Sequence, residues 1–510
     1  MSKFASATKT KAISPVTTLS QTVPDTVTHE GGAGFGRDAK SELFLLAVTN
    51  LVGEDTFYES GKQRDSRFRE LVRKVWMDDP GWIARFVPYL RNDLFLRSAP
   101  IVMALEAVKV ARETSAGGVN LRDMVNSAMR RADEPAEALA YWLTTYGKRI
   151  PMPVKRGIGD AAVRLYNERS VLKYDSAGAA VRMADVLELT HPDTTDNPLF
   201  RYLIDRRHNR DELKLDELPM IANRAYWDGL SSEEFRKQLV EADVLVAGGT
   251  WEWASSKYGK LDAAFWEKMI PSMGYMALLR NLRNFDDVGV SEAAREAVIA
   301  KLSDPEQVAN SMQLPLRFYN AYREARGFHW APALETALNL SLANVPTFPG
   351  RTLVLVDTSS SMFSSFSQRG TAQRYELAGI FGATIATRGD KVDLVEYGTD
   401  SAFLSFRKGD PVLRIVDQLT NRGGTETWGA LSRHFAGHDR VVIVTDEQAH
   451  PGYGYRAMPD VPIYTFNVAG YRAGHAPSGE GNLHTFGGLT DAGFRMIRLI
   501  EQASSGDWPF

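Results

Sequence analysis

The stretch TLVLVDTSSS (352–361) decides the fold of the C-terminal part of this chain. Its first six residues form a short, nearly continuous apolar run rich in β-branched side chains, which is typical of a strand buried on both faces. The pattern recurs in KVDLVEYG (391–398), RVVIVTD (440–446) and PIYTFNVAG (462–470), and helical stretches lie between these runs. Strands that alternate with helices predict a doubly wound, Rossmann-like parallel sheet over residues 350–510, with ligands at the carboxyl ends of its strands.

Oxygen-bearing side chains gather at this expected edge. An aspartate and two serines follow the first strand, the loop GGTETWGAL (423–431) carries threonines ahead of a helix, and a third strand ends in an aspartate. The candidate ligands are Asp357, Ser359, Ser361, Thr425 and Asp446. Two carboxylates with hydroxyls and water suit a hard divalent cation such as Mg²⁺ or Mn²⁺, and a vacant position would accept an acidic oxygen from a partner. The alternative is that these residues only cap the helices that follow the strands.

The order of these residues resembles a known metal site. A D-x-S-x-S sequence at 357–361, a GGT loop and a later strand ending in Asp446 are similar to the metal-ion-dependent adhesion site (MIDAS) of von Willebrand factor A domains. The resemblance implies that residues 350–510 form a von Willebrand factor A-like domain. It also implies that this domain binds a divalent metal ion and, through that ion, a ligand.

Residues 41 to about 342 carry a different pattern. Segments such as DSRFRELVRKVWMD and APIVMALEAVKVARE place apolar residues three and four positions apart, as amphipathic helices do. Pro, Gly and Asp-Pro breaks end these helices, so antiparallel helix pairs follow. Many consecutive helices without a clear strand predict an α-helical repeat array over residues 31–345. Residues 1–30 are rich in Ser, Thr and Lys, and we expect them to form a flexible arm.

Composition narrows the possible functions. The chain has 510 residues, of which 44% are hydrophobic and 24% charged, with 60 Lys and Arg against 63 Asp and Glu. This balance gives no general attraction to nucleic acid or membranes, so such binding requires a local patch. Cysteine is absent, which excludes disulfides and thiolate ligands. Because there is neither an apolar leader nor an uncharged stretch of about 18 residues, we expect a cytoplasmic protein with no membrane partner.

One local patch is visible in the helical part. Between Lys148 and Arg182, eight basic residues face only three acidic ones, and Tyr146, Tyr166 and Tyr174 are interleaved with them. Basic side chains neutralise phosphates and aromatic rings stack unpaired bases, so this composition is typical of a surface for single-stranded RNA. The alternative is a solvated helix face above core tyrosines.

The helical part also resembles a known module. The segments KRIPMPVKRGIGDAAVRLYN (148–167), VRMADVLELTHP (181–192) and LFRYLI (199–204) are similar to the TROVE module of the Ro ribonucleoprotein (Ro/SS-A autoantigen) family. GTWEW (249–253) and MALLRNLRNF (276–285) extend this similarity. A von Willebrand factor A domain follows where that family has one, so the chain resembles a bacterial member of the family.

The resemblance implies a ring of HEAT-like helix pairs, closed on itself beside the A domain, with a basic outer face for Y-like small noncoding RNA. Its hole would admit single-stranded ends of misfolded RNA, in RNA quality control or processing with a 3′-exoribonuclease. The residues expected to bind RNA are Lys148, Lys155, Arg156, Arg164, Lys173, Arg182 and His191. Lys173 and His191 fall on RNA-contacting positions of the family motif. A histidine before proline is also a common helix cap, and this alternative stays open for His191.

Sequence motifs of catalysis are missing. The nine histidines form no HExxH motif, and no serine lies in a G-x-S-x-G elbow, so we expect a non-enzymatic RNA-binding scaffold. Two alternatives stay open. The helical array could bind protein partners instead, in which case RNA binding with a steep salt dependence is not expected. A metal-dependent nuclease is the second, and its cleavage would vanish on replacing Asp357.

Overall fold

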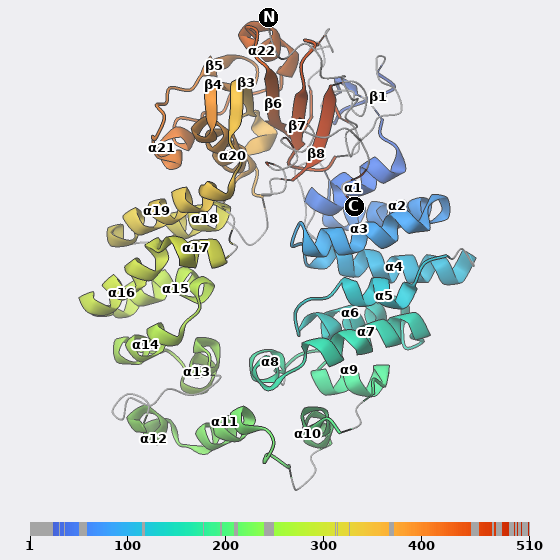
Figure 1. Ribbon diagram of the computed structural model, residues 1–510, viewed down its shortest axis with the longest axis vertical. Coiled ribbons are helices and arrows are strands. Elements are labelled where there is room, and N and C mark those ends of the chain that lie inside the picture. Colours follow the sequence, from blue (N-terminus) through green and yellow to red (C-terminus); the bar gives the residue numbers. More distant parts are fainter. Residues whose placement is uncertain are drawn as a thin grey trace, which may run out of the picture. The chain divides into compact units, whose positions relative to one another are not determined.

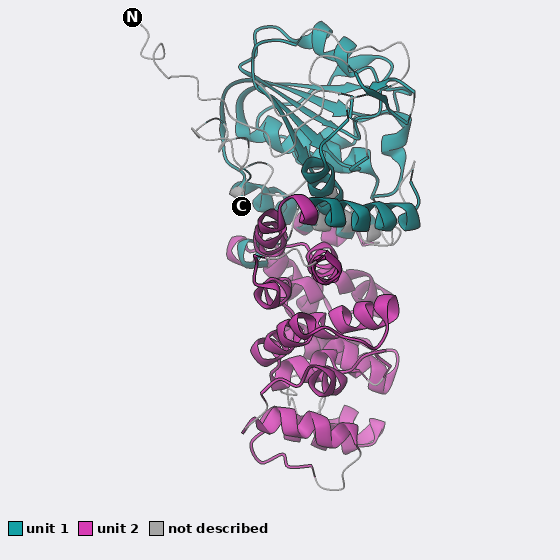
Figure 2. Cartoon of the chain, turned by 90° about the vertical axis from the view of Figure 1, so that its right-hand side faces the viewer, with its two compact units in different colours: residues 1–75, 308–323, 334–510 teal, residues 76–307, 324–333 magenta. Residues whose placement is uncertain are grey.

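We describe a computed structural model of the chain, in which contacts divide the residues into two compact units (Figure 2). Unit 1 consists of residues 1–75, 308–323 and 334–510, and unit 2 of residues 76–307 and 324–333. The structure describes residues 24–510 except 30, 35, 50–58, 115–117, 177, 194–195, 209–212, 239–248, 312, 314, 326, 367–371, 450–457, 472–473, 476–481, 489–493, 495–496, 498–500, 502–507 and 509.

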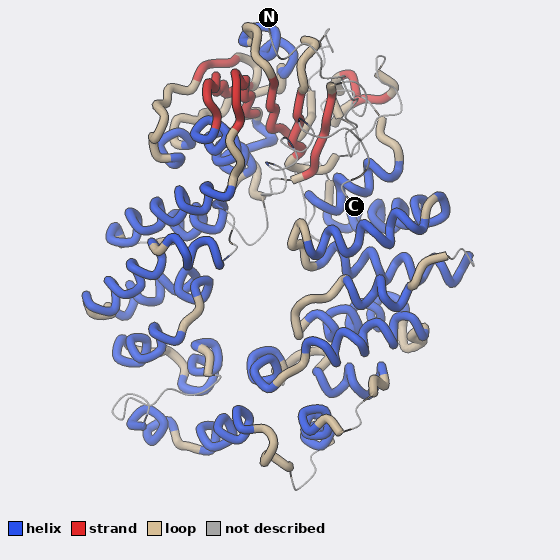
Figure 3. The backbone as a smooth tube through the Cα atoms, in the orientation of Figure 1, coloured by secondary structure: helices blue, strands red, loops and turns tan. Residues whose placement is uncertain are grey.

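A six-stranded sheet forms the centre of unit 1 (Figures 1 and 3). Its strands are β3 (Phe348–Asp357), β4 (Gly389–Tyr397), β5 (Ser401–Phe403), β6 (Arg440–Thr445), β7 (Ile463–Asn467) and β8 (Leu483–Gly487). Their order is β5-β4-β3-β6-β7-β8, and all neighbours are parallel except the β4–β5 pair at one edge. Because the strand order reverses at β3, the carboxyl ends of β3 and β6 lie at the switch point where such sheets bind ligands.

The sheet forms because the side chains of its central strands are apolar and buried. Every residue of β6 and β7 is buried, and Leu353, Leu355 and Ile443 pack with Trp428 in one apolar cluster. The helices of this part are η5 (Ser360–Phe363), α20 (Arg374–Arg388), α21 (Val412–Val416) and α22 (Thr427–His434). The four predicted strands are confirmed as β3, β4, β6 and β7. β5 and β8 were not predicted, because they have only 3 and 5 residues and carry no long apolar run.

Helices fill the described part of unit 2. They are α3 (Pro80–Asn92), α4 (Ser98–Thr114), α5 (Leu121–Ser127), α6 (Glu134–Tyr146), α7 (Met152–Leu165), α8 (Glu168–Tyr174), α9 (Met183–Thr190), α10 (Pro198–Arg207), α11 (Pro219–Gly229), α12 (Ser232–Arg236), α13 (Trp251–Tyr258), α14 (Ala263–Met269), η2 (Ile270–Ser272), α15 (Tyr275–Val288), α16 (Glu292–Ser303) and η3 (Phe328–Trp330). Their starts follow local signals. Asn120 and Asn167 cap α5 and α8 through side-chain oxygens, and prolines begin α3, α10 and α11.

Helices near one another in the sequence of unit 2 pack together: α3 packs with α4, and pairs separated by one helix also pack, as α5 with α7 and α7 with α9 (Figure 1). The α5–α7 contact is especially close at Gly157. A Cβ atom there would lie 2.7 Å from both the Arg122 carbonyl oxygen and the Val125 Cβ, so only glycine allows this approach. The contact brings the end of α7 beside the turn that follows α5.

The N-terminal residues of unit 1 pack onto the sheet. Strands β1 (Thr26–Val27) and β2 (Ala33–Gly34) form an antiparallel hairpin, followed by α1 (Ala39–Thr49) and α2 (Gly61–Asp78). The Thr28 hydroxyl donates to the Ala449 carbonyl at 2.6 Å, and the His29 amide donates to Gln448 Oε1 at 2.8 Å. The expected flexible arm is therefore wrong for residues 24–29, because their polar groups are bonded to the loop after β6. Residues 1–23 lie outside the described part.

The compact units also differ from the expected boundary near residue 345. Arg64 donates to the Ala469 carbonyl at 2.9 Å and Arg67 donates to the Gly470 carbonyl at 3.1 Å, which ties α2 to the loop after β7. The helices before the sheet are α17 (Pro305–Ser311), α18 (Pro315–Glu324), α19 (Ala331–Ser341) and η4 (Leu342–Asn344), and most of their residues also belong to unit 1. Long-range contacts of this kind leave no local signal in the sequence.

The predicted fold class is confirmed: α-helices in repeated packing precede a mostly parallel α/β sheet. Closure of the helical array into a ring stays a prediction. Among the described helices, none combines the length and the apolar character needed to cross a bilayer.

Candidate functional site

The first candidate site lies at the carboxyl edge of the sheet in unit 1. Asp357 ends β3 and is fully buried. The Ser359 amide donates to Asp357 Oδ1 at 2.8 Å, and the Thr445 hydroxyl at the end of β6 donates to Oδ2 at 2.5 Å. These two bonds hold the carboxylate in one orientation at the switch point of the sheet.

Hydroxyl groups surround this carboxylate. Ser359 and Ser361 are buried, and their Oγ atoms lie 3.3 Å apart. The loop that carries Thr425 is tied to the same turn, because the Ser360 amide donates to the Gly423 carbonyl at 2.7 Å. Thr425 is also buried. The three loops that the sequence suggested are therefore adjacent.

Asp446 completes the set of predicted ligands and is fully buried. Burial and then repulsion from the Asp446 carboxylate raise the pKa of Asp357 to about 7, against the opposing effect of hydrogen bonds from Ser359 and Thr445. Two carboxylates this close repel each other in a buried site, and a divalent cation with oxygen ligands would relieve that repulsion. The residues present fit Mg²⁺ or Mn²⁺ in this respect. Among the described residues, no group of three or more His, Asp or Glu side chains is placed to hold a metal, so the metal ligands proposed here include hydroxyl groups.

A second, buried charge pair lies next to this site and was not predicted. Glu447 has a left-handed backbone conformation with φ of 60°, and both its side chain and that of Arg37 are fully buried. Arg37 Nη2 lies 2.5 Å from Glu447 Oε2, and Asn467 Nδ2 donates to the same oxygen at 2.6 Å. Arg37, which lies between β2 and α1, thus binds the carboxyl edge of the sheet. Nothing in the sequence around Glu447 points to a partner 410 residues away.

The second candidate site is the basic stretch in unit 2. Lys148 lies in the turn before α7 and Arg156 on α7, and both are exposed. Lys155, also on α7, is half-buried, and Lys173 is exposed at the end of α8. Within the described part of the chain, none of these four side chains has an ion pair.

Three other predicted residues have structural contacts. Arg164 donates to the Met129 carbonyl oxygen at 2.7 Å and to Asn126 Oδ1 at 2.9 Å, although its side chain is exposed. Arg182 pairs at 2.7 Å with Asp175, whose side chain is 1% exposed. His191 follows α9 as its cap, with φ of 49°, and is exposed. The cap that was left open for His191 is therefore present.

The interleaved tyrosines have separate environments. Tyr166 is buried, and Tyr146 donates through its hydroxyl to the buried Glu106. Tyr174 lies near two basic groups: the Lys173 Nζ is 5.1 Å and the Arg131 guanidinium carbon 5.4 Å from its ring centroid. Arg131 lies outside the stretch 148–182, so charge counting along the sequence missed it.

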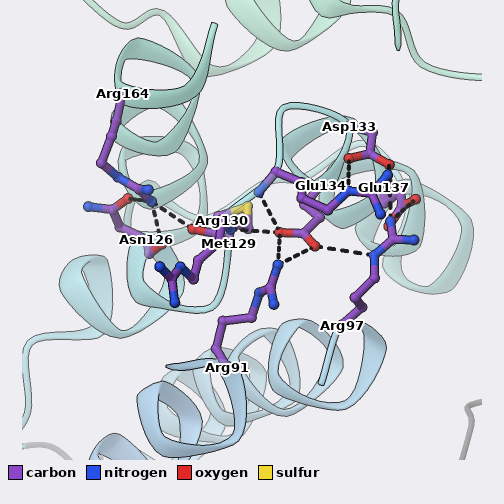
Figure 4. Close-up of polar contacts among 10 residues, drawn as sticks. Arg91, Arg97, Asn126, Met129, Arg130, Asp133, Glu134, Glu137 and Arg164 are labelled. Atoms are coloured by element: carbon purple, nitrogen blue, oxygen red, sulfur yellow. Dashed lines mark hydrogen bonds and ion pairs between the residues drawn. The ribbon is translucent and has the colours of Figure 1, made fainter. Parts of the chain in front are cut away.

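A buried carboxylate organises the turn that contains Arg131. Glu134 is fully buried and accepts from Arg91 Nη2 at 2.7 Å and from the amides of Arg130 at 2.6 Å and Arg131 at 2.9 Å (Figure 4). Arg97 lies 3.4 Å from the same carboxylate. The turn between α5 and α6 is therefore fixed to α3 and to the start of α4.

Part of the chain is similar in sequence to known proteins. A family model described as the TROVE domain matches residues 244–331. Telomerase protein component 1 of Mus musculus and that of Rattus norvegicus are each 39% identical to this chain over 75 residues, which are 14% of this chain and 3% of those proteins. The matched region is thus a small part of these relatives.

One solved structure resembles nearly the whole chain. The crystal structure of the Deinococcus radiodurans Ro (RSR) protein aligns with a TM-score of 0.62, covering 91% of this chain and 100% of that one. The sequence identity is 17%, so this likeness concerns the fold.

Proposed function

We propose that this chain is a member of the Ro family of TROVE proteins and that it is an RNA-binding scaffold, as the match to the TROVE domain model and the shared fold suggest. Its ligands would be Y-like small noncoding RNA and the single-stranded ends of misfolded RNA, in RNA quality control or processing. The observation that supports this most directly is the row of cations on α6–α9. Lys148, Arg156 and Lys173 are exposed and have no ion pair within the described residues, so their charge is available to phosphates.

The proposal has two further parts. The protein would act without catalysis, which we expect because its sequence carries none of the catalytic motifs considered above. A 3′-exoribonuclease would be a partner that processes the bound RNA. The alternative of a helical array that binds only proteins predicts no steep salt dependence of RNA binding, whereas the scaffold predicts that affinity falls steeply as salt rises.

Charge reversal at Arg156 and Lys173 is expected to weaken binding of a small structured RNA at least tenfold, or ~1.4 kcal/mol, since each reversal removes a phosphate contact and adds repulsion. Filter binding at several salt concentrations measures this. The control is the double reversal Lys214→Glu with Lys260→Glu, which changes the net charge equally at two exposed lysines outside the basic stretch. Unchanged affinity at low salt in the first variant, or an equal loss in the second, would contradict the proposed surface.

We also propose that Mg²⁺ or Mn²⁺ binds at the edge of the sheet through Asp357, Ser359, Ser361, Thr425 and Asp446. When bound, the ion would supply a Lewis-acidic position for an acidic oxygen of a partner. The chain's own residues hold the carboxylate of Asp357 in place through Ser359 and Thr445. The mutual repulsion of Asp357 and Asp446 supports this proposal, because a cation lowers the energy of that pair.

Replacing Asp357 by alanine is expected to abolish binding of Mn²⁺, measured by calorimetry, and to leave RNA affinity nearly unchanged. Ser360→Ala is the control, because Ser360 lies between the two predicted serine ligands and its side chain is exposed. Metal binding that survives in Asp357→Ala, with its fold intact by circular dichroism, would refute the metal site. An equal loss of RNA binding would show that the sheet edge and the RNA surface depend on each other.

A further inference from the structure

Arg164 is fixed in place by neutral groups. Its Nη2 donates to the Asn126 carbonyl at 3.1 Å, to Asn126 Oδ1 at 2.9 Å and to the Met129 carbonyl at 2.7 Å, at the end of α5 (Figure 4). Carbonyl oxygens orient a guanidinium but do not cancel its charge. Arg164 is therefore a positioned cation whose net positive charge remains for an external anion.

Arg130 supplies a second cation at the same place. Its side chain is exposed and extends toward Asn126, the residue to which Arg164 donates (Figure 4). In the part of the chain that the structure describes, its guanidinium has no carboxylate partner. Burial and then the charge of Arg130 lower the pKa of Arg164, which shows that the two cations act on each other.

Neighbouring carboxylates do not neutralise this pair. Five arginines surround three carboxylates here, namely Arg91, Arg97, Arg130, Arg131 and Arg164 around Asp133, Glu134 and Glu137. Arg91 pairs with Glu134, Arg97 with Asp133 and Glu137, and Arg131 with Asp133. The positive excess therefore resides on Arg130 and Arg164, the two arginines without a hydrogen-bonded carboxylate.

The turn keeps the two cations close. The Arg130 amide is bound by the buried Glu134 at 2.6 Å, so the backbone that carries Arg130 is anchored. Gly157 allows α7 to approach α5, which brings Arg164 to the same turn. Two cations held close together by a rigid backbone favour anion binding. The anion interacts with both charges, and little entropy is lost because the two side chains are already in place.

We propose that Arg130 and Arg164, with the Asn126 amide as a third donor, bind one backbone phosphate of RNA. This inference rests on the RNA-binding function proposed above and adds Arg130, which lies outside the basic stretch of the sequence. Two guanidinium groups offer planar forks of N–H donors that match phosphate oxygens. Arg131 in the same turn and Lys173 at the end of α8 both lie near the Tyr174 ring, so basic groups extend from this turn to α8.

Arg130→Gln tests this site without disturbing the turn, because no hydrogen bond or ion pair of the Arg130 side chain is present among the described residues. The variant is expected to weaken binding about three- to tenfold, equally for RNAs of different sequence, and to reduce the slope of log affinity against log salt by about one. Arg164→Gln should act in the same way. The double variant should lose less than the sum of the two single losses, since both arginines serve one phosphate.

Arg122→Gln is the matched control. Arg122 lies on α5, is also exposed, and contacts Asp160 on α7 through two bonds of 2.5 and 2.7 Å, so its charge is already neutralised. Its loss should leave the salt slope unchanged. If the unaltered protein binds RNA with a steep salt slope while Arg130→Gln and Arg122→Gln behave alike, the phosphate site is refuted and the RNA-binding function stands. If the unaltered protein binds no RNA, both are refuted.

Discussion

Replacing Arg37 by alanine is expected to destabilise unit 1 by about 3 to 5 kcal/mol. The change removes the cation 2.5 Å from Glu447 and leaves that carboxylate charged inside the protein, where it has lost contact with water. The remaining amide donor on Asn467 is a weak substitute for a guanidinium. Hydrogen exchange of the amides in β6 and β7 measures the opening free energy of this part of the sheet directly.

Two further variants make this prediction specific. Arg414 lies 3.8 Å from Asp410 and its side chain is 74% exposed, so Arg414→Ala should change stability by less than about 0.5 kcal/mol. The double variant Arg37→Met with Glu447→Gln removes both charges, and we expect it to regain much of the lost stability. A loss from Arg37→Ala no larger than that from Arg414→Ala would contradict the importance of the buried pair.

Much of the sheet could be predicted from the sequence because its strands are buried on both faces. The runs that begin at Thr352 and Arg440 are continuous and apolar, and a parallel sheet with its helices leaves few other places for them. The edge strand β5 and the short strand β8 could not be predicted in this way. Their formation depends on hydrogen bonds to β4 and β7, not on their own composition.

The metal site also has a part that could be predicted from the sequence and a part that could not. Asp357, Ser359, Ser361 and Asp446 could be placed together because the topology of the sheet brings the ends of β3 and β6 to one edge. What orients them is less local. The loop that follows Asp446 is held by Arg37 and Thr28, which lie more than 400 residues earlier, and Thr28 was expected to belong to a flexible arm.

Counting charged residues along the sequence also gave an incomplete picture of the basic surface in the helical part. It found Arg156 and Lys173 correctly as exposed cations, but it could not show that Arg164 and Arg182 have partners within unit 2. It also stopped short of Arg130 and Arg131, because these belong to another segment of the chain that the α5–α7 contact brings near. A helical repeat places such segments side by side, and a window along the sequence does not.

Replacing Glu134 by alanine is the second change with a large expected effect, a loss of about 3 to 5 kcal/mol from unit 2. The Arg91 side chain is 6% exposed and would lose its carboxylate partner. The amides of Arg130 and Arg131 would lose an acceptor that lies 2.6 and 2.9 Å away (Figure 4). An unpaired buried charge and two lost hydrogen bonds act in the same direction, so hydrogen exchange of α5 and α6 should accelerate.

Glu137→Ala on the same helix provides the comparison. Glu137 also contacts Arg97, at 3.2 Å, but its side chain is 53% exposed, so we expect a loss of less than about 1 kcal/mol. RNA affinity should follow the same order at a temperature where both variants stay folded. Glu134 fixes the turn that carries Arg130. If this turn becomes mobile, RNA binding must order the Arg130 side chain, and the lost entropy lowers the affinity. Equal RNA affinity in the two variants, despite a large difference in stability, would show that the turn does not need to be rigid for binding.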